Sequence, residues 1–335
     1  MALRRGDPRN SLRGPLNPRD DDRGIGEPVT RWLVTGTTGL LGSNAAISLA
    51  EANDVTGVSR TAPMGAPVPF VETDISSAAG RSGLVDRAEA DVVLHAAAIA
   101  SIEEAEQKPE LAWRLNVEAS ADLAAQAAEN GSRFVYISTD AVFDGENGPY
   151  DEGSEPSPTN EYGRTKLAGE RAVLEANPEA LVARVNFYGW SPSGTRSLAE
   201  FFHTRLALGE TVRGFTDTVV STLYVGHLVD AIAALVAAGA SGVTHVVSSE
   251  ATSKFDFGRR IAAGFGFDPQ LVQPALSTDV LAVKRGSDIS LSTGRASGML
   301  GAPLAGQQAG IDRLVTEFTS GRPAAVRQFA PQKAV

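Results

Sequence analysis

The sequence predicts an α/β protein with a doubly wound parallel sheet and a smaller C-terminal lobe. Apolar strand-like runs alternate with alanine-rich helical segments from residue 29 to about 185, and a glycine-rich loop follows the first run. The runs are almost continuously hydrophobic, which is typical of strands buried on both faces of a parallel sheet. Strands and helices in alternation are typical of doubly wound folds.

The individual elements follow in chain order. We expect strands at 31–36, 54–59, 69–73, 91–98, 133–139 and 181–187. The principal expected helices are 40–52 and 109–131, and the second starts at a proline and ends at a glycine, as helices often do. Beyond residue 189 short helices alternate with irregular segments rich in glycine, serine and threonine. We therefore expect a flexible extension at 1–28, a sheet domain at 29–189 and mainly a second lobe at 190–335, with the chain free to cross between lobes.

Composition excludes several classes of function. The formal net charge is −10, so sequence-independent binding to nucleic acid is not expected. Without cysteine there is no disulfide or thiol nucleophile, and four scattered histidines predict no metal site. No apolar run approaches the roughly 20 residues that span a bilayer, and residues 1–28 lack the apolar core of a signal peptide. A cytoplasmic protein is expected.

The segment VTGTTGLLG places three glycines between the first strand and the first helix. Gly36 would permit the tight turn, Gly39 the close approach of a pyrophosphate, and Gly42 the packing of helix on strand. This order of strand, loop and helix predicts a dinucleotide-binding Rossmann sheet. Further candidate contacts of the same loop are Thr38, Leu40 and Leu41.

The end of the second strand bears on the choice of cofactor. Ser59 and Arg60 stand where an acidic residue would hold the 2′-hydroxyl of NAD. A hydroxyl and a guanidinium suit a 2′-phosphate, so NADP(H) is favoured and NAD(H) remains an alternative. Arg60 could instead stack on the adenine or point into solvent.

The G-x-x-G-x-x-G spacing resembles the extended branch of the short-chain dehydrogenase/reductase superfamily. The resemblance implies an adenine contact at Asp74 and Ile75, and small residues beside the nicotinamide at Ala96, Ala97 and Ala98. Many relatives carry asparagine before those alanines, whereas this chain carries His95. For His95 we favour a buried, hydrogen-bonded role over a catalytic one.

The same resemblance supplies a catalytic set. Tyr162 and Lys166 form the Y-x-x-x-K pair, and their spacing of four places both on one helical face. A cation beside the phenol would favour the phenolate and lower its pKa toward the working range. Thr139, at the end of a strand, matches the residue that binds the substrate oxygen, and Asn116 matches the residue that supports a proton-relay water. Asn116 could instead mark a local helix kink.

The residue after Thr139 and Asp140 separates the possible reactions. Related 4,6-dehydratases carry glutamate there, and this chain carries Ala141, which disfavours elimination. The stretches STDAVFDG, HAAAIASIEEAEQKPELAWRLN and DISLSTGRASGMLGAP are similar to those of the dTDP-4-dehydrorhamnose reductases. The resemblance covers roughly residues 31–315. It implies reduction of a keto group on a nucleotide-linked or related sugar.

The resemblance also suggests where the sugar would bind and how the chain assembles. The expected substrate contacts are Asp140, Val142, Phe143, Asn186, Tyr188 and Arg213, the last as a partner for a diphosphate. A homodimer is suggested because related enzymes often pair through helices beside the catalytic tyrosine. Two alternatives stay open, namely an NAD-dependent nucleotide-sugar epimerase and a non-catalytic protein like the regulatory subunit of methionine adenosyltransferase.

Overall fold

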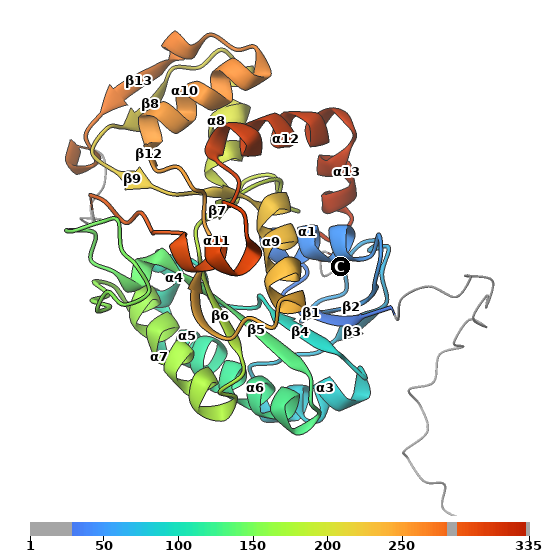
Figure 1. Ribbon diagram of the computed structural model, residues 1–335. Coiled ribbons are helices and arrows are strands. Elements are labelled where there is room, and N and C mark those ends of the chain that lie inside the picture. Colours follow the sequence, from blue (N-terminus) through green and yellow to red (C-terminus); the bar gives the residue numbers. More distant parts are fainter. Residues whose placement is uncertain (1–28, 280–286, 333–335) are drawn as a thin grey trace, which may run out of the picture.

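A parallel sheet of seven strands forms the centre of the molecule, which is seen here in a computed structural model that describes residues 29–279 and 287–332 (Figure 1). The strand order is β11-β6-β5-β4-β1-β2-β3, and the expected doubly wound sheet is confirmed. The strands are β1 (Arg31–Thr35), β2 (Asp54–Ser59), β3 (Phe70–Glu72), β4 (Val92–His95), β5 (Arg133–Thr139), β6 (Leu181–Val185) and β11 (Gly242–His245). The extension expected at 1–28 lies outside the described residues.

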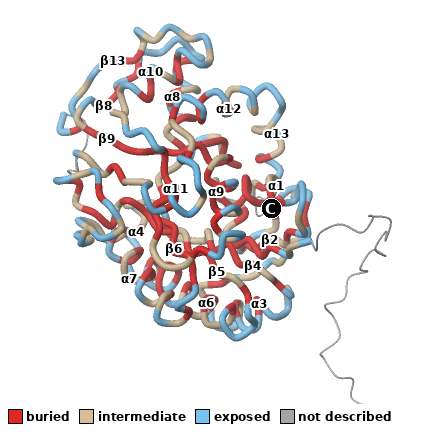
Figure 2. The backbone as a smooth tube through the Cα atoms, in the orientation of Figure 1, coloured by how far each residue is buried: buried red, intermediate tan, exposed pale blue. Residues whose placement is uncertain are grey.

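Both faces of this sheet are buried under helices, as the continuous hydrophobicity of its strands predicted. Along β1, Trp32 and Val34 belong to one apolar cluster and Leu33 to another on the opposite face. The first face is covered by α1 (Leu40–Leu49) and α9 (Val225–Ala237). The second face is covered by α3 (Leu84–Arg87), α6 (Ala119–Glu129) and α7 (Glu161–Ala176). Figure 2 shows the resulting buried layer between exposed helical surfaces.

The helix expected at 109–131 has a local irregularity. It consists of α5 (Pro109–Trp113), a π-helical turn η1 (Arg114–Glu118) and α6. Asn116 lies in that turn, so a kink of the kind considered from the sequence is present. Shorter helical segments of this half are α2 (Ala78–Arg81), α4 (Ile102–Gln107) and the 3₁₀ turn η2 (Asp140–Val142).

Two expected strands end earlier than the sequence indicated. The run at 91–98 leaves the sheet after His95, so the three alanines lie in the following loop. The run at 181–187 is interrupted at Asn186, whose carbonyl accepts a hydrogen bond from the Leu223 amide. The next two residues form β7 (Phe187–Tyr188), which pairs with β10 (Leu223–Tyr224) instead of with the central sheet.

The second lobe lies beyond the carboxyl ends of the sheet (Figure 1). Its elements are α8 (Leu198–Ala207), β8 (Val212–Phe215), β9 (Val219–Val220), β12 (Thr252–Ser253), α10 (Lys254–Phe265), η3 (Pro269–Leu271), β13 (Val272–Ala275), η4 (Ser277–Asp279) and α12 (Gln307–Thr319). Helix α11 (Gly294–Leu300) packs on α9 and β11 of the sheet half, and α13 (Arg322–Arg327) lies between α12 and α1. Strand β11 returns from this half of the chain to pair with β6, so the chain crosses the expected boundary near residue 189. Within the described residues, no helix is long and apolar enough to cross a membrane.

A buried ion pair fastens α7 to the sheet. Arg184 of β6 donates from Nε to Oε1 of Glu170 at 3.0 Å and from Nη2 to Oε2 at 2.8 Å. Both side chains are almost completely buried, at 4% and 2% exposure. Ser138 of β5 donates a further hydrogen bond to the same carboxylate. Helix α7 is thereby fixed to two adjacent strands through one side chain.

We expect Arg184→Met to lower the free energy of unfolding by about 3–5 kcal/mol, because it leaves the Glu170 carboxylate buried and uncompensated. Urea denaturation measures the change. The double variant Arg184→Met/Glu170→Gln should be more stable than Arg184→Met alone. As a matched control, Arg205→Met removes an exposed pair with Glu210 and should cost under about 1 kcal/mol. A similar small loss in Arg184→Met would contradict the assignment.

Candidate active site

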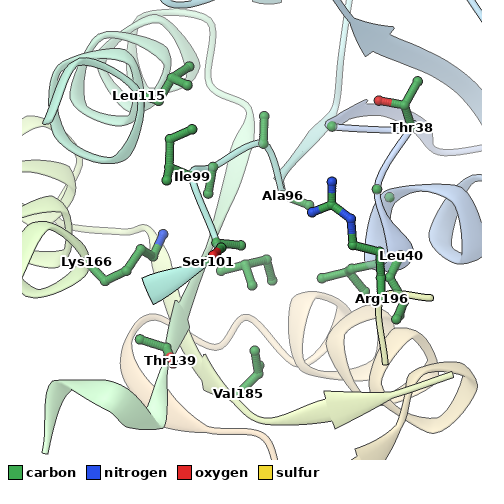
Figure 3. A pocket seen from close by; sticks show the side chains of 18 of the residues that line it. Thr38, Leu40, Ala96, Ile99, Ser101, Leu115, Thr139, Lys166, Val185 and Arg196 are labelled. Carbon is green, nitrogen blue, oxygen red and sulfur yellow. The ribbon is translucent and has the colours of Figure 1, made fainter. Parts of the chain in front are cut away.

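A cavity of about 570 Å³ opens at the carboxyl ends of the strands, between the sheet and the second lobe. The glycine loop after β1 and the alanine loop after β4 form one part of its wall, and the ends of β5 and β6 form another. Figure 3 shows Lys166 and Arg196 entering it from opposite sides. Carboxyl ends of parallel strands are where open α/β sheets bind ligands. The cavity is therefore the candidate active site.

The glycine loop has little room for side chains. Gly36 has φ of +73°, and a Cβ added there would lie 2.8 Å from the Ala97 backbone. A Cβ on Gly42 would lie only 2.3 Å from the Gly36 carbonyl oxygen. These two glycines therefore close the turn and bring α1 against it, as their spacing predicted. Gly39 forms the N-cap of α1 without a side-chain cap, and the neighbouring residues Thr38, Leu40 and Leu41 line the cavity with it.

Ser59 and Arg60 line the cavity at the end of β2, where the sequence placed the adenosine half of a dinucleotide. The Ser59 hydroxyl donates to the Thr61 carbonyl at 2.9 Å, and Arg60 is exposed. After β3, Ile75 lines the cavity and Asp74 lies beside it in sequence. The pKa of Asp74 is lowered, chiefly by its hydrogen bonding with Ser76 and also by the nearby charge of Arg60. This end of the cavity thus combines a hydroxyl, a guanidinium and a carboxylate.

His95 is a structural residue, as expected. Its ring is buried, with Nδ1 at 2.9 Å from Thr35 Oγ1 and Nε2 at 3.0 Å from Ser120 Oγ. Burial lowers the pKa of His95 to about 3, so the imidazole is neutral at physiological pH. The three alanines that follow, 96–98, line the cavity.

Asn116 binds protein groups with every polar atom of its side chain. Its amide donates to the Ile99 carbonyl and to Thr165 Oγ1, both at 3.1 Å, and its Oδ1 accepts from the Ile99 amide at 3.0 Å. Its backbone carbonyl accepts from the Tyr136 hydroxyl at 2.8 Å. Asn116 therefore fixes the loop after β4 to α7, and its expected support of a proton relay stays a prediction.

Thr139, Asp140 and Asn186 line the cavity beside one another. Thr139 Oγ1 donates to Asp140 Oδ1 at 3.0 Å, and Asn186 Nδ2 donates to the other oxygen of that carboxylate at 2.5 Å. Burial raises the pKa of Asp140, while these two hydrogen bonds oppose the shift. Ala141, the next residue, contributes no side chain with acid or base chemistry. The ends of β5 and β6 thus present the Asp140 carboxylate to the cavity, held by the Asn186 amide and the Thr139 hydroxyl.

Tyr162 and Lys166 project from one face of α7 into the cavity. Burial raises the pKa of Tyr162 to about 12, a hydrogen bond with Thr139 opposes the shift, and nearby Asp140 adds to it. Burial also lowers the pKa of Lys166 to about 7, against the opposing charge of Glu170, and the ammonium lies 3.8 Å above the Tyr136 ring. The expected lowering of the Tyr162 pKa is therefore not found, because desolvation outweighs the hydrogen bond with Thr139.

Two expected substrate contacts are buried away from the cavity. Val142 and Phe143 are 0% and 3% exposed and belong to a small apolar cluster. The Phe143 ring stacks on Tyr150 at 4.2 Å between centroids, and the Arg184 guanidinium lies over it. The turn after Asp140 points these side chains inward, so they have no surface to offer a sugar in this structure.

Tyr188 and Arg213 also lie outside the cavity. Tyr188 is fully buried against Phe257, because the pairing of β7 with β10 turns it into the core. Arg213 is exposed on β8, in the outer part of the second lobe. The cavity is lined instead by Phe187 and Arg196, which sequence reasoning missed. Neighbouring residues of a strand point to opposite faces, so the sequence could have offered Phe187 as the cavity residue in place of Tyr188. No local signal in the sequence indicates that Arg196 points into the cavity.

The described ranges, 29–279 and 287–332, contain no group of three or more histidines or carboxylates able to hold a metal ion.

Comparison with known proteins identifies relatives along most of the chain. Residues 30–320 match the family model described as the RmlD substrate binding domain. A probable low-salt glycan biosynthesis reductase, Agl14, of Haloferax volcanii is 36% identical over 253 residues, which is 74% of this chain and 84% of the relative. A dTDP-4-dehydrorhamnose reductase of Mycobacterium tuberculosis strain CDC 1551 is 33% identical over 255 residues, or 74% of this chain and 79% of the relative.

The fold matches solved structures as well. A crystal structure of a dTDP-4-dehydrorhamnose reductase from Bacillus anthracis strain Ames, in complex with NADP, superimposes with a TM-score of 0.76 at 23% identity. The superposition covers 87% of this chain and 100% of that one. The predicted Rossmann architecture is confirmed.

We expect Lys166 to titrate near pH 7 in the ligand-free protein, because burial disfavours its ammonium form. Lysine labelled with ¹³C at Cε allows the titration to be followed by NMR, and the chain has only five lysines. The unfolded lysine holds its proton to a higher pH than the folded one, so this group makes stability rise with pH from about 7 upward.

The variant Lys166→Met assigns the Lys166 resonance, and the urea-unfolded protein provides the reference for an unperturbed lysine, with a pKa of about 10.4. A Lys166 resonance that titrates in the folded protein at the same pH as lysine in the unfolded protein would contradict the predicted desolvation.

Proposed function

The chain belongs to the RmlD substrate binding domain family, and we propose that it reduces a keto group on a nucleotide-linked or related sugar with NADPH or NADH. The observation that carries the proposal is that Thr139, Tyr162 and Lys166 line the same cavity as the glycine loop. The relatives named as a probable low-salt glycan biosynthesis reductase and as a dTDP-4-dehydrorhamnose reductase each match 74% of this chain, and they support the same reaction class. The homodimer suggested by the resemblance stays a prediction.

The residues present fit a dinucleotide. At Gly36 and Gly42 the backbone of the loop packs so closely on neighbouring backbone that a Cβ would clash with it. The N-terminus of α1 has no side-chain cap, so its first amides are available to a diphosphate. Ser59 and Arg60 would hold the adenosine end, and Arg60 favours a 2′-phosphate. The alanine loop would border the nicotinamide. When bound, the reduced cofactor supplies the hydride for the carbonyl carbon.

Tyr162 is suited to supply the proton. Its raised pKa keeps the phenol protonated at neutral pH, and a protonated phenol can donate to the oxyanion that forms at the sugar carbonyl. Thr139 can turn its hydroxyl from Asp140 toward the same oxygen and polarise it. Lys166, one helical turn from Tyr162, would stabilise the phenolate that remains. Asp140 and Asn186 would orient the sugar hydroxyls from the end of β5 and β6.

Three alternatives to the reductase can be compared with it. Elimination of water needs an additional acid and base, and Ala141 stands where the related dehydratases carry glutamate. An epimerase must first oxidise its substrate with Tyr162 as a base, whereas the two relatives compared above are both named reductases. A binding protein without turnover would need Tyr162 neither as an acid nor as a base. An assay for turnover therefore distinguishes it from the reductase.

We expect Tyr162→Phe to lower kcat at least a hundredfold while leaving the affinity for NADPH nearly unchanged, because the ring remains and only the proton donor is lost. Absorbance at the nicotinamide band follows turnover with a panel of nucleotide-linked keto-sugars, and fluorescence titration gives the affinity. Tyr150→Phe removes another phenol, one that hydrogen-bonds Asp144 outside the cavity, and should stay active. Full activity of Tyr162→Phe would rule out this acid.

We expect Arg60→Met to weaken NADPH binding about tenfold or more while changing NADH binding by less than twofold, because only NADPH carries the 2′-phosphate. The two dissociation constants are measured with the same preparation, and Arg164→Met, on the outer face of α7, is the control. Equal loss for both cofactors, or none for either, would show that Arg60 does not recognise the 2′-phosphate.

A further inference from the structure

Arg196 enters the cavity from the second lobe. It lies in the loop between β7 and α8, and its guanidinium points toward the region of Leu40 and Ala96 in Figure 3. Leu40 is the first residue of α1, directly after the glycine loop. A cation from one lobe thus faces the phosphate-binding loop expected on the other.

The backbone of this loop is held firmly. Glu200, which is 2% exposed, accepts hydrogen bonds from the amides of Ser191, Arg196 and Ser197 at 2.6, 2.9 and 3.1 Å. Ser197 caps α8 by accepting from the Glu200 amide at 3.2 Å, and its hydroxyl donates to the Gly189 carbonyl at 2.7 Å. The backbone at Arg196 is therefore held in place, while its side chain is exposed. A ligand contact would have to order the side chain but not the loop.

The Arg196 guanidinium has no hydrogen-bond or ion-pair partner among residues 29–279 and 287–332. Arg213 and Arg259 are also without such a partner among the described residues, but neither lines the cavity. Three other arginines of the second lobe are paired. Arg205 pairs with Glu210 at 3.0 Å, Arg260 with Glu250 at 2.9 Å and Arg313 with Glu317 at 2.8 Å. An arginine left unpaired beside a cavity is available to a ligand.

The opposite wall of the cavity is electropositive too. Helix α1 spans ten residues, and its N-terminus has neither a side-chain cap nor an acidic residue in the first turn. The amides of that turn and the helix dipole present partial positive charge. Two positive groups facing each other across one cavity are complementary to an anion between them. A diphosphate satisfies both, since the amides bind one side and guanidinium binds phosphate oxygens bidentately.

We propose that Arg196 holds the diphosphate of the dinucleotide from the second lobe, opposite the glycine loop. The proposal rests on the function proposed above. Its consequence is that the cofactor bridges the two lobes through its own phosphates, before any sugar is bound. Arg196 takes the role that sequence reasoning gave to Arg213, but for the cofactor's diphosphate.

The test compares dissociation constants by titration calorimetry, without turnover. Arg196→Met should weaken binding of NADPH and of 2′-phospho-ADP-ribose by about tenfold to a hundredfold, because both contain the diphosphate. Binding of adenosine 2′-phosphate, which lacks it, should change by less than twofold. Arg196→Lys keeps the positive charge but loses the bidentate geometry of the guanidinium. Its dissociation constant for NADPH should lie between those of the wild type and Arg196→Met. Arg205→Met, on the following helix, is the matched control, and melting temperatures check that each variant is folded.

The outcomes are separable. If Arg196→Met binds NADPH as tightly as Arg205→Met does, the proposal is wrong. If Arg196→Met weakens only a nucleoside diphosphate sugar, the guanidinium serves the substrate's diphosphate and the proposal is equally wrong. A wild-type chain that binds no dinucleotide overturns both proposals. A wild-type chain that binds NADPH through Arg196 but reduces no keto-sugar overturns the proposed function and leaves this inference standing.

Discussion

The position of the face of α7 that lines the cavity depends on the buried pair between Glu170 and Arg184. Tyr162, Lys166 and Glu170 are spaced by four residues, so they share one face of the helix. Glu170 is the one of the three that is anchored to the sheet, through Arg184 of β6 and Ser138 of β5. The end of β5 also carries Thr139. This ion pair therefore helps to fix the position of α7, which carries Tyr162, relative to the end of β5, which carries Thr139.

The parts of the site that could be predicted from sequence are those with a local geometric cause. The glycine loop is fixed by backbone contacts too close for a side chain, and such contacts leave glycines at set spacings. The tyrosine and lysine are fixed by the helical period. His95 could be identified as structural because nothing near it in sequence offered catalytic chemistry, and Thr35 and Ser120 now account for both ring nitrogens.

The parts that could not be predicted depend on pairing between distant segments. Whether Phe187 or Tyr188 reaches the cavity depends on β7 leaving the sheet to join β10, thirty-odd residues further along the chain. Phe143 is buried because Tyr150 and Arg184 provide surfaces for both faces of its ring. Arg213 and Arg196 are alike in sequence terms, and only the loop held by Glu200 brings one of them to the cavity. The alternation of side chains along a strand and the secondary-structure propensities of residues are local, so they do not indicate which distant segments pair.

The ionisation of the two groups on α7 is compatible with the reduction proposed for this cavity. In the ligand-free cavity burial keeps the proton on Tyr162 and weakens the hold of Lys166 on its own. A developing alkoxide would take the phenolic proton, which leaves a buried phenolate. That new negative charge raises the pKa of a neighbouring amine, so Lys166, with a pKa near 7, would then gain or retain its proton. In the proposed reduction, this buried pair would give up one proton inside the cavity and neutralise the charge left behind.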